Sequence, residues 1–207
     1  ITVGSLFAVW LEDGAGKLEV VFFDVGQGDS AFVETPNSFQ MLIDGGPTSI
    51  ILDKLGQEMP FYDRTIDLII LSHPDIDHLT GLLEVLKRYE IKNVLWTGVV
   101  GGTAEYQEWA KLIKEEGANI IIASAGEKIV LQESPLIYFL VLYPFDSLEG
   151  KEIEETNETS VVGRLVFGNK SFLFMGDVSS KIEKELIEKY GVELNSDILK
   201  IAHHGSK

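Results

Sequence analysis

The sequence contains no cysteine among its 207 residues. This absence excludes a disulfide framework, a cysteine-based zinc site and a cysteine nucleophile. It does not indicate a cellular compartment, because cysteine-free chains occur on both sides of a membrane. A chain of this length can bury about 70% of the surface that its unfolded form exposes, so it needs neither a disulfide nor a metal simply to fold. The length predicts a single domain over residues 1–207.

Basic residues are also scarce. The chain has 17 Lys and Arg against 33 Asp and Glu, which gives a formal net charge of −16. This balance argues against a surface that holds nucleic acid through bulk electrostatics, because such a surface needs clustered Lys and Arg. It raises instead the question of whether some of the carboxylates bind metal ions.

Long hydrophobic runs are missing. The longest apolar runs, such as Leu68–Leu71 and Leu136–Leu142, are far shorter than the roughly 20 residues that a membrane-spanning helix needs. The stretch Leu6–Leu11 is apolar but short and has no basic flank, so it does not predict a signal peptide. We therefore expect this chain to be soluble by itself, and any targeting or membrane segment of the parent protein to lie outside it.

Short apolar, β-branched runs alternate with helical patterns along the chain. Strands are predicted over Leu6–Glu12, Leu18–Val25, Ser30–Glu34, Gln40–Ile43, Asp67–Leu71, Asn93–Trp96, Asn119–Ala123, Lys128–Leu131, Leu136–Leu142, Ser160–Phe167, Ser171–Phe174 and Asp197–Ala202. Helices are predicted over Ile50–Leu55, Leu79–Arg88, Ala104–Glu115 and Val178–Tyr190, and a surface loop over Leu148–Glu158. This order predicts a layered α/β or α+β domain, with sheets covered by helices.

Histidine placement is the most informative feature, because the four histidines are His73, His78, His203 and His204. The first two bound the run His73-Pro74-Asp75-Ile76-Asp77-His78, which follows a predicted buried strand. A loop there can aim both histidines and both carboxylates into one pocket, and packing them so closely without a cation would be electrostatically costly. The alternative is a solvated turn in which Asp77 caps a helix. We favour a metal site.

Several other predicted strands end in residues suited to ligand binding. One is followed by a glycine-rich turn whose N–H groups could cradle an anion. Asp44 could orient a ligand from behind or form an Asx turn, and Asp177 could bind a ligand or cap the next helix. Open α/β sheets place ligand sites at such strand ends, so the convergence predicts a divalent-metal hydrolase. The residues at strand ends are Gly26, Gln27, Gly28, Asp29, Asp44, Asp177, His203, His204 and Ser206. Asn157 and Ser160 instead open a predicted strand and in isolation indicate only a polar turn.

The motifs, taken in order, resemble the metallo-β-lactamase superfamily, and more narrowly the hydrolase domain of ComEC-type DNA-uptake proteins. The resemblance covers residues 20–207. It implies a four-layer αββα sandwich with a metal site at one edge. The matching runs are Phe23-Asp24-Val25-Gly26-Gln27-Gly28-Asp29-Ser30, Leu42-Ile43-Asp44-Gly45-Gly46, Leu71-Ser72-His73-Pro74-Asp75-Ile76-Asp77-His78, Asn157-x-x-Ser160, Gly176-Asp177 and His203-His204-Gly205-Ser206-Lys207.

The resemblance implies two divalent ions, Zn²⁺ or Mn²⁺, with Mg²⁺ as a further alternative. Across the wider superfamily the position of Asp75 is usually His, and a further His occupies the region where this chain has Asn157 and Ser160. The ion site that contains His73 and Asp75 is therefore oxygen-rich and is predicted to bind its ion more weakly, which favours Mn²⁺ or Mg²⁺. The implied ligands are Asp77, His78, Asp177 and His203 or His204 around one ion, and His73 and Asp75 at the other, with Asp177 bridging.

The end of the chain departs from the family pattern. Members of the family continue beyond the double-His motif with more strands and a helix, whereas this sequence stops at Lys207. We expect a C-terminally truncated domain whose second half is incomplete. An exposed apolar sheet edge would then either pair with another copy or be unstable.

Three functions are compatible with this pattern. The first is a metal-dependent phosphodiesterase, a nuclease acting on DNA, in which Asp75 or Asp77 orients the attacking water and His203 or His204 protonates the leaving group. The Gly26–Ser30 turn would then hold a phosphate. The second is a lactonase or a phosphorylcholine-type esterase on the same scaffold. The third is a degenerate domain that binds a partner or nucleic acid without cleaving it.

The resemblance also bears on the parent protein. It implies a membrane channel domain elsewhere in the full-length protein, and an extracytoplasmic or membrane-attached location for this domain. Its substrate would be DNA or another phosphodiester.

Overall fold

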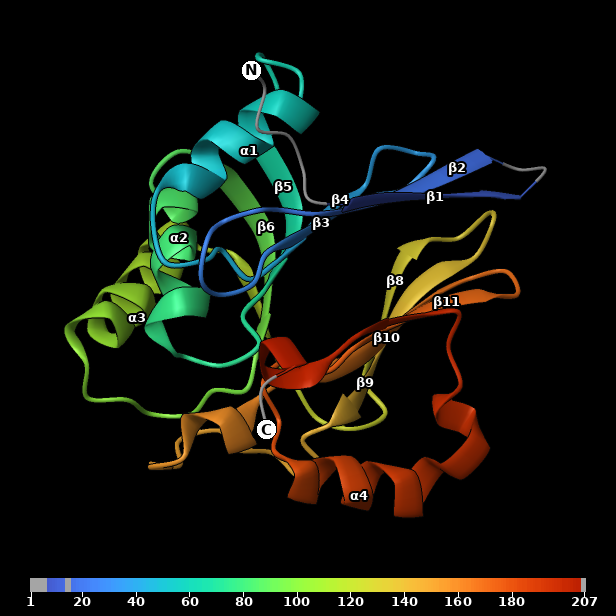
Figure 1. Cartoon of the computed structure of the whole chain (residues 1–207). Helices are drawn as coiled ribbons and strands as arrows, with labels where there is room; N and C mark the ends of the chain where they lie inside the picture. Colours follow the sequence, from blue (N-terminus) through green and yellow to red (C-terminus); the bar gives the residue numbers. More distant parts are fainter. Residues whose placement is uncertain (1–6, 14–15, 206–207) are drawn as a thin grey trace.

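The computed structural model describes residues 7–13 and 16–205. Two β-sheets face each other, and helices cover the outer face of each one (Figure 1). The layers therefore follow the order helix, sheet, sheet, helix, and the αββα sandwich expected from the sequence is confirmed. The predictions made for Ser206 and for the side chain of His204 lie outside the described residues.

The first sheet has seven strands in sequence order, β1 to β7. The strands from β1 to β4 pair antiparallel, and those from β4 to β7 pair parallel. The parallel register sets Ile43 beside Ile70, so β4 and β5 end next to each other. The strands are β1 Phe7–Asp13, β2 Gly16–Phe22, β3 Ala31–Glu34, β4 Gln40–Ile43, β5 Thr65–Ile70, β6 Glu90–Trp96 and β7 Asn119–Ile122.

Three helices pack on the outer face of this sheet: α1 Ile50–Glu58, α2 Ile76–Leu86 and α3 Ala104–Glu116 (Figure 1). As its continuous apolar sequence predicts, β5 is buried on both faces. Ile69 contributes to the core beneath the helices, while Leu68 and Ile70 contribute to the core between the sheets.

The second sheet has five strands in the order β12-β11-β10-β9-β8, and its outer face is covered by α4 Ser180–Tyr190. Its pairs are antiparallel except for β11 with β12, which is parallel. The strands are β8 Lys128–Gln132, β9 Ile137–Tyr143, β10 Val162–Phe167, β11 Lys170–Phe174 and β12 Ile198–Lys200, and the short 3-10 helices are η1 Thr156–Thr159, η2 Gly191–Leu194 and η3 Ala202–Gly205.

Several element predictions differ from the structure at their ends. The strand predicted over Leu18–Val25 ends at Phe22 as β2, and the helix predicted over Ile50–Leu55 continues to Glu58 as α1. The sequence predicts a last strand that runs to Ala202, but β12 stops at Lys200 and η3 begins at Ala202. The predicted loop Leu148–Glu158 contains the start of η1 and a bridge from Glu152 to Val100. The helix predicted over Leu79–Arg88 begins earlier, at Ile76. The prediction missed this start because apolar spacing marks only the buried face of a helix and does not reveal a polar first turn.

The edge of the second sheet carries apolar side chains. Among the described strands, β12 pairs with β11 alone. Leu199 and Ile201 beside this edge are about half exposed.

None of the described helices is long and apolar enough to cross a membrane.

Candidate metal centre

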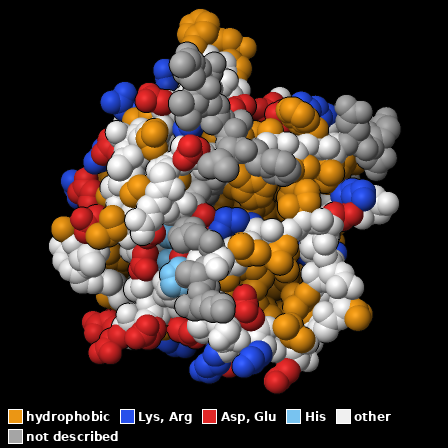
Figure 2. Space-filling model, in the orientation of Figure 1, with side chains coloured by type: hydrophobic (Ala, Val, Ile, Leu, Met, Phe, Trp, Pro, Cys, Tyr) orange, Lys and Arg blue, Asp and Glu red, His pale blue; other side chains and the backbone are white. Residues whose placement is uncertain are grey.

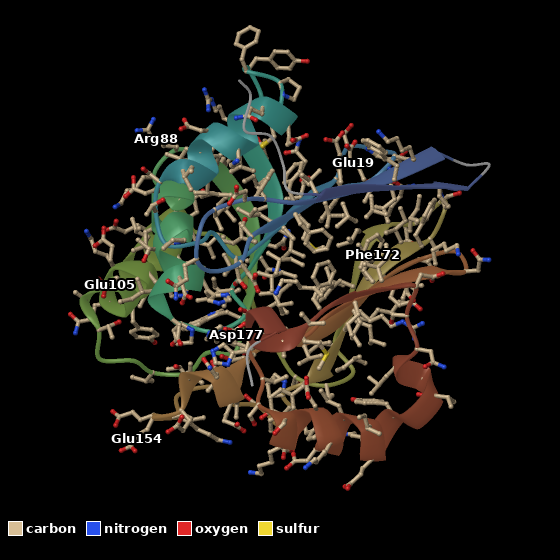
Figure 3. All side chains as sticks on the ribbon, in the orientation of Figure 1. Glu19, Arg88, Glu105, Glu154, Phe172 and Asp177 are labelled. Carbon is tan, nitrogen blue, oxygen red and sulfur yellow. The ribbon has the colours of Figure 1, made fainter. Side chains whose placement is uncertain are left out.

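The candidate site forms where strand ends of both sheets meet. The parallel pair β4 and β5 brings Asp44 beside the segment that begins at Ser72, and the backbone N–H of Asp44 donates to Ile70 O (2.9 Å). The parallel pair β11 and β12 brings the segment carrying Asp177 beside His203. The two sheets are joined here by a hydrogen bond from Val161 N to Ser72 O (2.8 Å). Figure 3 labels Asp177 at this junction.

Three buried side chains converge at the junction. His73, His78 and Asp177 are 1%, 0% and 4% exposed. Each offers one possible ligand atom, and these atoms all lie within 4.8 Å of one another. The two imidazole ring centres are 4.2 Å apart, and His78 Nε2 lies 3.4 Å from Asp177 Oδ2. The chain therefore presents two imidazoles and a carboxylate to one small volume.

The start of α2 explains how His73 and His78 meet. His73 lies in the loop after β5, and the extended backbone of Asp75 precedes the first helical residue. The carbonyl oxygen of Asp75 then accepts hydrogen bonds from the backbone N–H groups of His78 (3.0 Å) and Leu79 (2.8 Å). His78 thus falls in the first turn of α2, whose apolar face holds it against the sheet.

Asp44 fixes the orientation of both histidines from behind. Its carboxylate accepts hydrogen bonds from Ser72 N (2.8 Å) and Ser72 Oγ (2.6 Å), and contacts His78 Nδ1 at 2.9 Å. Ser72 Oγ also lies 3.0 Å from His73 Nδ1. Because both Nδ1 atoms are engaged in this way, the Nε2 atoms are the ring nitrogens that face the junction, where His78 Nε2 lies 3.4 Å from Asp177 Oδ2. Carboxylate and hydroxyl groups commonly orient metal-binding histidines in this manner.

The carboxylates also set the charge state of the site. Burial by itself would lower the pKa of His78, but the carboxylates of Asp44 and Asp177 outweigh burial and raise the pKa to about 11. In the metal-free chain His78 is therefore an imidazolium at neutral pH. Contact with His73 and a hydrogen bond from Thr156 hold the pKa of Asp75 below its ordinary value, against the opposing effect of partial burial.

The donor set fits a divalent cation. His73 Nε2 is buried and makes no hydrogen bond among the described residues, which is costly for a polar atom unless something else engages it. Two imidazole nitrogens and a carboxylate are also the ligand types that Zn²⁺ and Mn²⁺ accept. His73, His78 and Asp177 are the residues that would hold such an ion.

The remaining predicted ligands lie around this group rather than in it. Asp75 Oδ2 is 3.6 Å from His73 Nε2, and Asp75 accepts a hydrogen bond from the Thr156 hydroxyl. Asp77 lies in the first turn of α2, and His203 is exposed, with its backbone N–H 3.3 Å from Gly176 O. Neither Asp77 nor His203 is among the three residues whose ligand atoms cluster within the described chain. Their predicted roles as ligands stay predictions.

The glycine-rich turn packs against the site. A β-carbon on Gly28 would lie 2.0 Å from the carbonyl oxygen of Asp77, so the turn approaches the start of α2 too closely for any side chain there. The carboxylate of Asp29 contacts the ammonium of Lys200, whereas Gly26 and Gln27 are exposed. The turn therefore supports α2, and its phosphate-binding role stays a prediction.

Ser160 supports the loop that carries Asp177. Its buried hydroxyl oxygen accepts a hydrogen bond from Asp177 N (3.0 Å). Asn157 lines a cavity of about 340 Å³ together with Asp177 and His203. Sequence reasoning missed Ser72, Thr156 and Lys200; Ser72 could have been suspected from its place before His73, whereas the other two make contacts between segments far apart in the chain.

Acidic side chains line the approaches to the site. A larger cavity of about 780 Å³ runs beside Asp75 and Asp77 and is bordered by Glu152 and Glu154. The cavity beside Asp177 is bordered by Glu155, Glu158 and Glu183. Figure 2 shows acidic side chains gathered at the lower left, in the region where Figure 3 labels Glu154. An anionic ligand would therefore meet negative charge on its way in.

Two facing sheets, helices on both outer faces and a buried His-His-Asp group where the strand ends meet define an αββα protein with a candidate divalent-metal centre. Residues 23–207 match the model of the metallo-beta-lactamase superfamily, and the chain belongs to this superfamily. The superfamily binds divalent metals.

Two of the curated relatives of the chain are competence proteins. It is 28% identical over 206 residues to ComE operon protein 3 of Bacillus subtilis (strain 168), covering 91% of this chain and 26% of that protein. It is 30% identical over 188 residues to competence protein ComA of Neisseria gonorrhoeae, covering 90% of this chain and 24% of that protein. The ComEC-type resemblance is confirmed, and the chain spans about a quarter of the length of these relatives.

Solved structures agree on the fold. The subclass B3 metallo-beta-lactamase MEM-A1, from a soil metagenome library, superposes with a TM-score of 0.58 at 15% identity, covering 97% of this chain and 80% of that one. The metallo-beta-lactamase fold protein YhfI of Bacillus subtilis gives a TM-score of 0.53 at 16% identity, covering 83% and 62%. Identities this low show a shared fold and nothing further.

Proposed function

We propose that this chain is a metal-dependent phosphodiesterase that cleaves DNA, as the hydrolase domain of a ComEC-like protein. The observation that carries the proposal is the buried group of His73, His78 and Asp177, each with a ligand atom within 4.8 Å of the others. The competence proteins among the relatives support DNA as the substrate.

The chain's own residues divide the work of hydrolysis. His73, His78 and Asp177 would hold a divalent cation, and Asp75, Asp77 and His203 or His204 would complete a site for two. Such a cation, when bound, supplies Lewis-acid activation of water and neutralises charge on the phosphate. Asp75, whose Oδ2 lies 3.6 Å from His73 Nε2, would accept a hydrogen bond from the attacking water. His203 or His204 would donate a proton to the leaving oxygen.

The direct test is cleavage of single-stranded and duplex DNA by the purified chain with Mn²⁺ or Zn²⁺. We expect cleavage that EDTA abolishes, and a loss of about a hundredfold or more in Asp177→Asn, because the substitution removes an anionic candidate ligand. Glu188→Gln, an exposed carboxylate on α4, should retain the wild-type rate and serves as the matched control. Equal rates for Asp177→Asn and wild type would contradict the proposal.

A second candidate is favoured by the acidic cavity walls. Glu152, Glu154 and Glu158 repel a long polyanion more strongly than a small substrate. The same metal group would then serve a lactonase or a phosphorylcholine-type esterase. Including lactones and small phosphodiesters in the assay separates the candidates, because this alternative predicts turnover of the small substrates with no cleavage of DNA.

The parent protein supplies the context for either activity. Because the chain spans about a quarter of its curated relatives, we propose that the full-length protein also contains a membrane channel domain. The hydrolase domain formed by this chain would then lie outside the cytoplasm. A DNA strand delivered to it there would compensate for the poor affinity of its acidic surface for DNA.

A further inference from the structure

Lys200 points into the space between the two sheets. Side chains alternate along a strand, and Ile198 on β12 packs in the core between the sheets while Leu199 is 53% exposed. Lys200 therefore shares the inward side with Ile198. Its Nζ atom lies 2.5 Å from Asp29 Oδ2, and the two side chains are 24% and 17% exposed.

Asp29 belongs to the first sheet's side of the site. It lies in the glycine-rich turn between β2 and β3. Its backbone oxygen accepts a hydrogen bond from Gly46 N (3.0 Å), and the neighbouring Ser30 Oγ donates to Asp44 O (2.9 Å). Asp29 is therefore fixed to the segment that carries Asp44, which orients His78.

Lys200 belongs to a segment that its own sheet holds weakly. β12 has three residues and pairs with a single strand among those described. The chain then enters η3, where His203 adopts φ 47° and its N–H lies 3.3 Å from Gly176 O. A contact at the end of β12 therefore has a large share in placing residues 201–205.

We propose that Lys200 and Asp29 form a positioning pair that ties the end of β12 to the first sheet and so sets residues 201–205 and the Asp177 loop against His73 and His78. A cavity of about 30 Å³ supports this, because Lys200 and Asp29 line it together with Asp44, Ser72 and Gly176. The pair thus lies directly behind the metal group. The link that this pair makes between β12 and the first sheet, called the tether below, is inferred from the contacts alone. Only its effect on metal binding rests on the proposed function.

A second ion pair, between the start of β11 and the residue before β12, provides the matched control. Lys170 Nζ lies 2.7 Å from Asp197 Oδ1 at the opposite end of β11 and β12, with side chains 47% and 34% exposed. Water screens an exposed pair of this kind, whereas losing one partner of the better shielded Lys200 pair leaves an unbalanced charge between the sheets. The two lysines therefore differ in how well their ion pairs are shielded from water, and the proposal depends on that shielding.

The experiment compares backbone hydrogen exchange and Zn²⁺ affinity in wild type, Lys200→Met, Lys200→Arg and Lys170→Met. In the metal-free chain we expect Lys200→Met to exchange amides 201–205 about tenfold faster or more, and Lys170→Met to match wild type there. Zn²⁺ affinity, measured by competition with a chromophoric chelator, should fall about tenfold in Lys200→Met. Lys200→Arg, which keeps the positive charge, should stay close to wild type in both amide exchange and Zn²⁺ affinity. Asp29→Asn, which is nearly isosteric, replaces Lys200→Met if that variant does not fold.

The outcomes separate the two proposals. Exchange of amides 201–205 no faster in Lys200→Met than in Lys170→Met would overturn the tether. Faster exchange with unchanged Zn²⁺ affinity would overturn the positioning of the metal group. A wild-type chain that binds no Zn²⁺ or Mn²⁺ would instead overturn the proposed function, while exchange in the metal-free chain would still decide the tether.

Discussion

Asp44 is the residue on which the geometry of the candidate site depends most. It is 2% exposed and holds Ser72 N, Ser72 Oγ and His78 Nδ1 with one carboxylate. Its own φ of 57° is in the left-handed region, which a side chain other than glycine adopts rarely. A neutral amide there could not accept all three contacts or balance the charge of His78.

We therefore predict that Asp44→Asn weakens Zn²⁺ binding about 10- to 100-fold, as is typical for groups that orient metal-binding histidines. Isothermal titration of the metal-free chain measures the change. Asp67→Asn is the control, because Asp67 also accepts a backbone N–H, from Gln40 (2.8 Å), and is remote from the histidines. A similar loss in both variants would indicate general destabilisation instead.

At this scale the sequence predicts some roles better than others. His73 and His78 are predicted because both lie in one short motif that follows a buried strand, and Asp177 is predicted because it follows another predicted strand. The sequence cannot tell that Asp77 lies beside the group while Asp177 lies in it, since that depends on how the sheets face each other. For the same reason it does not reveal Lys200, whose partner is 171 residues away.

At the scale of elements, α2 and the loop after β4 approach each other through glycines. A β-carbon on Gly81 would lie 1.9 Å from Gly45 O, and one on Gly45 would lie 2.4 Å from Leu82 N. The approach allows hydrogen bonds from Gly45 N to His78 O and from Gly81 N to Gly46 O, both 2.8 Å. Two glycines thus set how closely the helix bearing His78 docks on the loop bearing Asp44.

Gly81→Ala should destabilise the protein by about 2 kcal/mol or more, because backbone atoms oppose the added methyl group. This outcome reverses the gain of about 1 kcal/mol that alanine normally gives inside a helix. Urea unfolding measures both effects. The control is Gly56→Ala in α1, where nothing lies within 4 Å of the added carbon, and there we expect a gain of about 0.5–1 kcal/mol. A gain at both positions would contradict the packing argument.

Element boundaries show where sequence reasoning stops. Apolar spacing locates the buried faces of α2 and α4, but not the polar first turn of α2 that contains Asp77 and His78. The predicted end of β12 is also wrong. Ile201 and Ala202 are apolar and so extend the predicted strand, but β12 ends at Lys200 and η3 begins at Ala202. Such ends are decided by contacts with other segments, which a local pattern does not contain.

At the scale of the whole molecule, the site joins two halves of the fold. His73 and His78 come from the first sheet's side and Asp177 from the second's, so a bound cation would tie the halves together. In the metal-free chain, His78 takes part of that role as a cation between Asp44 and Asp177. Metal and proton therefore compete for the same place between the sheets.

This competition predicts opposite pH trends. The pKa of His78 is raised from 6.5 to about 11 in the folded chain, so its stabilising charge is fully present below about pH 6.5 and is lost as the pH rises through about 11. Metal binding requires the neutral imidazole and so strengthens with pH. Between about pH 7 and about pH 9, the metal-free melting temperature should fall while the increase caused by Zn²⁺ grows. Scanning calorimetry measures both, and His78→Gln should flatten both trends. If the wild type and His78→Gln showed the same pH slopes, proton and metal would not be competing at His78.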